Sequence, residues 1–157
     1  MRAAARRSAR RRDGVPNAVF VVAGAESMPR ELRGVADRVT VQFPWGSLLH
    51  GILRADEPVL TNLAEIAAPG AKLTIVWSVA NGDRVAAPPT LSEPVQARFA
   101  GAGFEIRALR PATADEIAAT GSTWAKRLRA GTDRPVTLLR AVRSDRLPVQ
   151  PDTASCR

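Results

Sequence analysis

The 157-residue chain has very little cysteine or histidine, and Cys156 and His50 are the single residues of each type. A single cysteine excludes a disulfide framework. A single cysteine and a single histidine are also too few for a Cys/His metal cluster, so we expect no metal cofactor. Hydrophobic runs are also short, because the longest, residues 18–25, is far below the roughly 20 residues that span a bilayer. The N-terminus has no secretory signal pattern, and we therefore expect a cytoplasmic protein that does not bind membranes.

Acidic residues are absent from residues 1–12, which hold six arginines. The rest of the chain has 17 basic and 15 acidic residues, so the net charge of +8 comes mainly from this N-terminal run. An isolated cationic segment is typical of proteins that bind polyanions, nucleic acid above all. A solvated helix face or a frayed tail would look the same, so the charge indicates a basic protein without identifying its partner.

Common nucleotide-binding and hydrolase motifs are missing too. No G-x-G-x-x-G or G-x-x-x-x-G-K-[ST] sequence follows a strand pattern, since Gly101-Ala102-Gly103 falls at the end of a predicted helix. There is no G-x-S-x-G turn, and His50 has no evident nucleophile near it in the sequence. Both observations argue against a hydrolase.

Strand and helix patterns alternate along the chain. Runs of β-branched and apolar residues predict strands at residues 18–24, 38–43, 72–80, 104–109 and 136–142. The run at residues 18–24 is apolar without interruption, which predicts a strand buried on both faces. Capping residues predict helices that begin at Asp56, Ser92, Thr113 and Ser122. The alternation predicts an α/β sheet with parallel crossovers, one domain over residues 1–143, and a disordered tail over residues 144–157.

Two tryptophans fall on predicted loops or helix starts. Trp45 lies in Phe43-Pro44-Trp45-Gly46-Ser47-Leu48-Leu49, after the 38–43 strand and thus at the edge where α/β sheets bind ligands. Trp124 begins the helix at Ser122 and precedes three cations, Lys126, Arg127 and Arg129. Such a pair could stack a nucleobase while the cations bind phosphates. The alternative is that each tryptophan packs against its own neighbours.

These motifs resemble those of the aminoglycoside-resistance 16S rRNA (adenine-N1) methyltransferases of the kanamycin–apramycin type. The resemblance rests on Phe43–Leu49, on Ala23-Gly24-Ala25-Glu26 after a strand pattern, and on Ser122-Thr123-Trp124 before a basic helix. It implies a Rossmann-like class I methyltransferase sheet. It also implies S-adenosylmethionine-dependent methylation of adenine N1 in the decoding site of small-subunit (16S) rRNA, which confers aminoglycoside resistance.

The resemblance implies roles for individual residues. Trp45 and Trp124 match the family positions that hold the flipped adenine, and Ser122 matches a polar position near the base. The cations of the Ser122 helix, namely Lys126, Arg127 and Arg129, are expected to bind rRNA phosphates. Positions that contact S-adenosylmethionine fall in two groups: Ala25 and Glu26 at its adenine end, and Phe43, Trp45 and Ser47 along its methionine part.

The N-terminal part of the family pattern is missing. A sheet of this family starts with a strand, a Gly-rich cofactor loop, a helix and a second strand ending in an acid, and no such patterns occur here. We therefore expect an N-terminally truncated sheet with a gap between the strands at 18–24 and 38–43, and weak or no cofactor binding. Two alternatives stay open: a catalytically inactive remnant that binds RNA, and a methyltransferase of another substrate in which the tryptophans are core residues.

Overall fold

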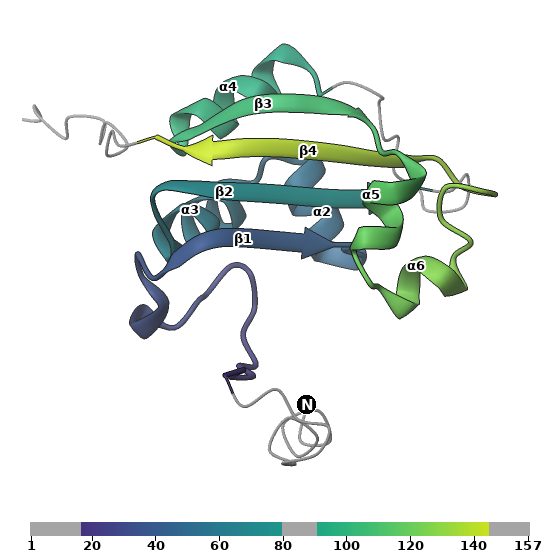
Figure 1. The fold of residues 1–157 in the computed structure, drawn as a ribbon. Helices are drawn as coiled ribbons and strands as arrows, with labels where there is room; N and C mark the ends of the chain where they lie inside the picture. Colours follow the sequence, from purple (N-terminus) through teal and green to yellow (C-terminus); the bar gives the residue numbers. More distant parts are fainter. Residues whose placement is uncertain (1–16, 80–90, 145–157) are drawn as a thin grey trace, which may run out of the picture.

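The computed structural model describes residues 17–79 and 91–144, and its centre is a four-stranded mixed sheet (Figure 1). The strands are β1 (Ala36–Gln42), β2 (Ala67–Ser78), β3 (Phe104–Pro111) and β4 (Val136–Arg143). Their order is β1-β2-β4-β3, with β1 parallel to β2 and β4 antiparallel to both of its neighbours. The prediction of four of the strands is confirmed, whereas parallel pairing holds only for β1 and β2.

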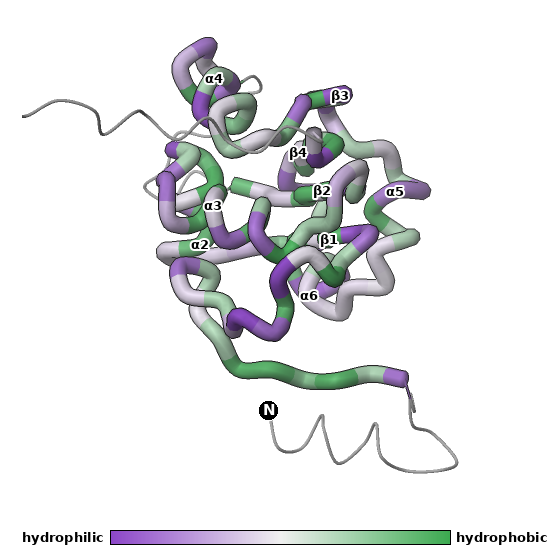
Figure 2. Tube along the Cα trace, turned by 90° about the vertical axis from the view of Figure 1, so that its left-hand side faces the viewer, coloured by the Kyte–Doolittle hydropathy of each residue, from purple (hydrophilic) through white to green (hydrophobic). Residues whose placement is uncertain are grey.

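Helices cover the two faces of the sheet unequally. Figure 2 shows α2 (Gly46–Arg54), α3 (Glu57–Ile66) and α4 (Glu93–Gly101) on one side, and α5 (Ala114–Ala119) and α6 (Thr123–Arg127) on the other. A short 3-10 turn, η1 (Arg30–Leu32), precedes β1. The predicted helix starts are confirmed for α3, α4, α5 and α6, whereas α2 was not predicted. Within the described ranges, no helix is long and apolar enough to cross a membrane.

The apolar side chains form two clusters, one on each side of the sheet. The main core lies beneath α2, α3 and α4 and includes Leu73, Ile75 and Trp77 of β2. The second core cluster is smaller and lies at the carboxyl end of β1, between the sheet and α6. Its buried members are Phe43, Val76, Ala125, Val136 and Leu138. Alternate residues of β2 point to the two clusters, as expected for a strand covered on both faces at this end.

The segment at residues 18–24 is not a buried strand, contrary to the sequence prediction. Val19 and Val22 are 89% and 77% exposed, and the segment makes only a single bridge, between Gly24 and Ser27. Figure 2 shows this apolar stretch passing clear of the sheet. A strand needs a neighbour for its N–H and C=O groups, and the described residues offer none beside it. The arginine run at 1–12 and the predicted tail beyond Ser144 lie outside the described residues.

Gly51 of α2 allows that helix to approach α3 closely. A Cβ atom at Gly51 would lie 2.8 Å from Cγ2 of Val59, so substitution forces the two helices apart. We expect Gly51→Ala to lower the free energy of unfolding by about 1–3 kcal/mol, measured by urea denaturation. The matched control is Gly101→Ala in α4, where no atom lies within 4 Å of the added Cβ. This variant should be neutral or stabilising by about 0.5–1 kcal/mol, and equal effects at both sites would contradict the prediction.

Candidate active site

Trp45 is presented to solvent by a tight turn at the end of β1. Phe43 adopts a left-handed conformation with φ 47°, and its N–H donates to the Val76 carbonyl at 2.7 Å. This turn buries the Phe43 side chain in the second core cluster, where it is 4% exposed, and leaves Trp45 78% exposed as the N-cap residue of α2. The alternative in which Trp45 packs against its own neighbours does not hold, because most of the indole surface is free.

Trp124 lies in the first turn of α6, a helix held in place by its N-cap residue and by one buried side chain. Ser122 caps the helix, because its Oγ accepts from the Ala125 N–H at 3.3 Å, as predicted from the sequence. Ala125 is buried in the second core cluster, whereas Trp124 is 42% exposed. The Arg127 guanidinium carbon lies 5.3 Å from the Trp124 ring centroid, so a cation covers part of one indole face.

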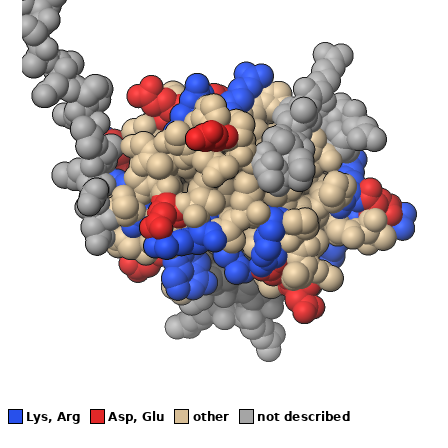
Figure 3. All heavy atoms as spheres, turned by 90° about the horizontal axis from the view of Figure 1, so that it is seen from above, with Lys and Arg blue, Asp and Glu red and all other residues tan. Residues whose placement is uncertain are grey.

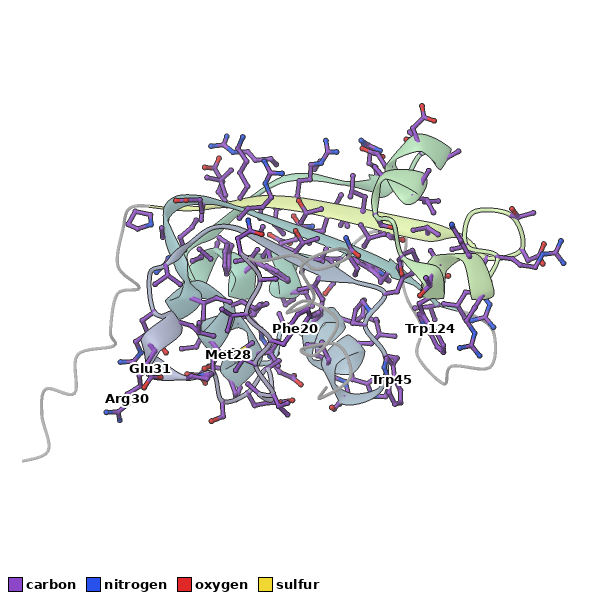
Figure 4. All side chains as sticks on the ribbon, turned by 60° about the horizontal axis from the view of Figure 1, so that its bottom comes forward. Phe20, Met28, Arg30, Glu31, Trp45 and Trp124 are labelled. Carbon is purple, nitrogen blue, oxygen red and sulfur yellow. The ribbon has the colours of Figure 1, made fainter. Side chains whose placement is uncertain are left out.

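The second core cluster links the two tryptophans. Trp45 follows the cluster residue Phe43 by two positions, and Trp124 immediately precedes the cluster residue Ala125. Figure 4 shows both indoles at the same end of the sheet, where β1 ends and α6 packs. Two exposed aromatic rings that share one buried support can hold a flat, polarisable ligand such as a nucleobase.

The predicted RNA-binding cations are all exposed on or just after α6. Arg127 contacts Trp124, and Arg129 forms an exposed ion pair with Asp133 at 3.0 Å. Exposed ion pairs contribute little free energy, so Arg129 can exchange this partner for a phosphate at small cost. Seen from above, Lys and Arg side chains gather along one side of the molecule, with a few acidic side chains among them (Figure 3). The three cations therefore place positive charge beside Trp124.

The predicted cofactor-binding residues fall in two separate places. Ser47 is exposed in the first turn of α2, next to Trp45, whereas the buried Phe43 side chain faces the second core cluster. Ala25 and Glu26 lie on a turn that is fastened to α3, because the Asn62 amide donates to the Glu26 carbonyl at 3.0 Å. The structure thus places Trp45 and Ser47 together at the start of α2, whereas the turn with Ala25 and Glu26 is bonded to α3.

The chemistry of Trp45 and Ser47 fits the methionine part of S-adenosylmethionine. An indole face attracts a sulfonium cation, and the N-terminal turn of a nine-residue helix favours a carboxylate. The Phe43 side chain is turned away, so a contact from this residue would come from its main chain. In the described parts of the chain, no group of three or more His, Cys, Asp or Glu side chains is arranged to hold a metal ion.

Glu116 connects α5 to the sheet and was predicted only as part of a capping box. That box is confirmed, with Thr113 and Glu116 exchanging hydrogen bonds. Glu116 also accepts two hydrogen bonds from Arg110 of β3, at 2.9 and 2.7 Å, and one from Arg140 of β4, at 2.8 Å. These partners were missed because they come from strands that the sequence alone does not place beside α5.

These contacts lower the pKa of Glu116 from 4.5 to about 2, chiefly through the Arg110 hydrogen bond and next through the Thr113 N–H. The folded protein therefore favours the carboxylate, and the resulting stability is present above pH 4.5 and is lost as the pH falls toward 2. We expect Glu116→Gln to have a lower melting temperature than wild type at pH 7. The two melting temperatures should converge between pH 4.5 and 2. A difference that stays constant over that range would contradict this role.

Comparison with known proteins identifies relatives over most of the chain. The family model NpmA, described as 16S rRNA (adenine(1408)-N(1))-methyltransferase, matches residues 1–143. The chain is 32% identical over 132 residues to the enzyme of that name from Escherichia coli, and 33% identical over 130 residues to that from Streptoalloteichus hindustanus. Each alignment covers 77% of this chain and 60% of the relative. The chain thus spans about three fifths of the length of these curated relatives.

Solved structures agree with the sequence comparison. The 16S rRNA (adenine(1408)-N(1))-methyltransferase from Catenulisporales acidiphilia superposes with a TM-score of 0.77 at 33% identity, over 94% of this chain and 73% of that one. A tryptophan-to-alanine variant of that enzyme, solved with S-adenosylmethionine as cosubstrate, gives 0.76 at 32% identity, over 96% and 72%. Because the family match extends over nearly the whole chain and the fold agrees, the chain belongs to the 16S rRNA (adenine(1408)-N(1))-methyltransferase family.

Proposed function

We propose that this protein takes part in S-adenosylmethionine-dependent methylation of adenine N1 in 16S rRNA, with Trp45 and Trp124 holding the target base. The observation that carries the proposal is the pair of exposed indoles supported by one buried cluster at the carboxyl end of β1. Family membership supports the reaction and the substrate. The small ribosomal subunit is the proposed partner, the cytoplasm is the proposed location, and aminoglycoside resistance is the proposed consequence.

The reaction requires alignment more than acid–base chemistry. Adenine N1 carries a lone pair at neutral pH, so it forms the new N–C bond without prior loss of a proton. S-adenosylmethionine supplies the methyl group on a sulfonium, and the sulfur keeps the electron pair of the broken S–C bond. The methylated base becomes cationic, and indole faces at Trp45 and Trp124 stabilise that charge by cation–π attraction.

Base flipping and RNA binding draw on other properties of the site. Extruding a base costs a few kcal/mol, which stacking at about 1–3 kcal/mol per base largely offsets. Lys126, Arg127 and Arg129 would hold the phosphates beside the flipped base, so binding should weaken as salt rises. Trp45 and Ser47 would hold the methionine part of the cofactor, and Ala25 and Glu26 remain the proposed contacts at its adenine end.

The direct test is methyl transfer to isolated small ribosomal subunits. The purified chain is incubated with S-adenosylmethionine labelled in the methyl group, and the rRNA is digested and analysed for labelled 1-methyladenosine. The proposal predicts label in this nucleoside, against the expectation of weak or no cofactor binding drawn from the missing N-terminal pattern, and label in another nucleoside or in no RNA would contradict it. Salt-dependent binding of the subunits without methylation would instead support the inactive RNA-binding alternative.

A further inference from the structure

Ser78 ends β2 midway between the elements that carry the two tryptophans. In the sheet, β2 lies between β1, whose end leads to Trp45, and β4, which follows α6 and Trp124. Ser78 pairs with Val136, the first residue of β4, and lies two residues beyond Val76, the partner of Gln42 at the end of β1. The backbone register thus puts Ser78 at the end of the sheet near the elements that carry both tryptophans.

The Ser78 side chain points to the same face as α6. Side chains alternate along a strand, so Ser78 shares a face with Val76, which belongs to the second core cluster. Its cross-strand partner Val136 belongs to that cluster too, and directly paired residues point to the same side of a sheet. Ser78 is 8% exposed, so its side chain is buried on the face of the sheet where the second core cluster supports both tryptophans.

The Ser78 hydroxyl is buried without a hydrogen-bond partner in the described parts of the chain. Three other hydroxyls around this end of the sheet, those of Thr113, Thr120 and Ser122, each make a hydrogen bond. A buried hydroxyl without a partner is unfavourable, and a ligand that binds at this end of the sheet could supply the missing partner. The other unpaired group, Trp77 Nε1, belongs to the opposite face inside the main core and does not approach this site.

We propose that Ser78 Oγ accepts a hydrogen bond from the exocyclic amino group of the target adenine. This inference rests on the proposed function. N1 must keep its lone pair free for the methyl group, so the adjacent amino group is the part of that base edge that can donate. A hydroxyl oxygen has lone pairs to accept it. Ser78 is thus a specificity residue that selects a 6-aminopurine and fixes the direction in which N1 points.

The first test compares Ser78→Ala with wild type in the methylation assay and in thermal unfolding. We expect kcat/KM to fall about 3- to 10-fold, the usual effect of one neutral hydrogen bond. The melting temperature should stay the same or rise, because the variant removes a buried polar group that has no partner among the described residues. The matched control is Thr61→Ala, which deletes an exposed hydroxyl on α3; it should leave kcat/KM unchanged and raise the melting temperature slightly, because alanine has the higher helix propensity. A lower melting temperature for Ser78→Ala would assign the hydroxyl a structural role and overturn the proposal.

The second test changes the base. Reconstituted subunits carry purine, which lacks the amino group, in place of the target adenine. We expect wild type and Ser78→Ala to methylate this substrate at equal rates, so that the difference seen with adenine disappears. An equal loss on both substrates, or weaker S-adenosylmethionine binding by Ser78→Ala in calorimetry, would assign the hydroxyl to another ligand group and overturn the proposal. If wild type methylates adenine but Ser78→Ala is unaffected, this inference fails alone, whereas an inactive wild type refutes the proposed function as well.

Discussion

Replacing Trp45 with alanine is expected to lower kcat/KM for rRNA methylation by about 10- to 100-fold. Stacking of one base on one aromatic ring contributes about 1–3 kcal/mol, and Trp45→Ala removes one of the two rings that hold the target. The indole is largely exposed, so the free energy of unfolding should change by less than about 0.5 kcal/mol. The two measurements together separate a binding role from a structural one.

Trp124→Ala should lower the rate by a similar factor, and phenylalanine at either site should restore part of it because a flat ring is retained. The matched control is Trp77→Ala, which removes the same side chain from the main core and should cost about 3–5 kcal/mol of stability. If Trp45→Ala destabilised the fold as strongly as Trp77→Ala, Trp45 would be a core residue and the base-binding account would be wrong.

Phe43→Ala is expected to lower the free energy of unfolding by about 3–5 kcal/mol and to abolish methylation at temperatures where wild type is active. Phe43 fills the second core cluster between the end of β1 and α6, so its loss leaves a cavity beneath both tryptophans. Its left-handed backbone also sets the turn that exposes Trp45. Chemical denaturation followed by fluorescence measures the loss.

The control for this variant is Phe20→Ala, the same substitution at a side chain that is exposed. It should leave both the stability and the methylation rate unchanged. Phe43→Leu keeps an apolar side chain and should recover most of the stability. A stable Phe43→Ala protein with wild-type activity would show that the second core cluster does not position the tryptophans.

The elements of this fold that depend on local sequence were predictable. The alternating residues of β1 and the strand pattern of β2 appear in the sequence, as do the capping box at Thr113 and the N-cap at Ser122. The segment at 18–24 has a strong strand pattern, but a strand forms only beside a partner, which the described residues do not supply. The antiparallel pairing of β4 also depends on how distant segments meet.

The tryptophans were predicted from their positions at a strand end and a helix start, and from the resemblance to a family motif, whereas their mutual support was not visible in the sequence. Phe43 and Ala125 are far apart along the chain and meet only because β1 and α6 pack at one end of the sheet. The same holds for Glu116 with Arg140, and for Ser78, which is an ordinary strand serine until its neighbours are known. Long-range packing decides these contacts, and a single sequence carries little information about it.

The central claim is that Trp45 and Trp124 hold the same base, and a double-mutant cycle tests it most directly. The kcat/KM for rRNA methylation is measured for wild type, Trp45→Ala, Trp124→Ala and the double variant. Residues that act as a unit have strongly non-additive effects, so the double variant should lose little more than the worse single variant. If the two single losses multiplied in the double variant, the tryptophans would act on separate parts of the RNA, and the account would be contradicted.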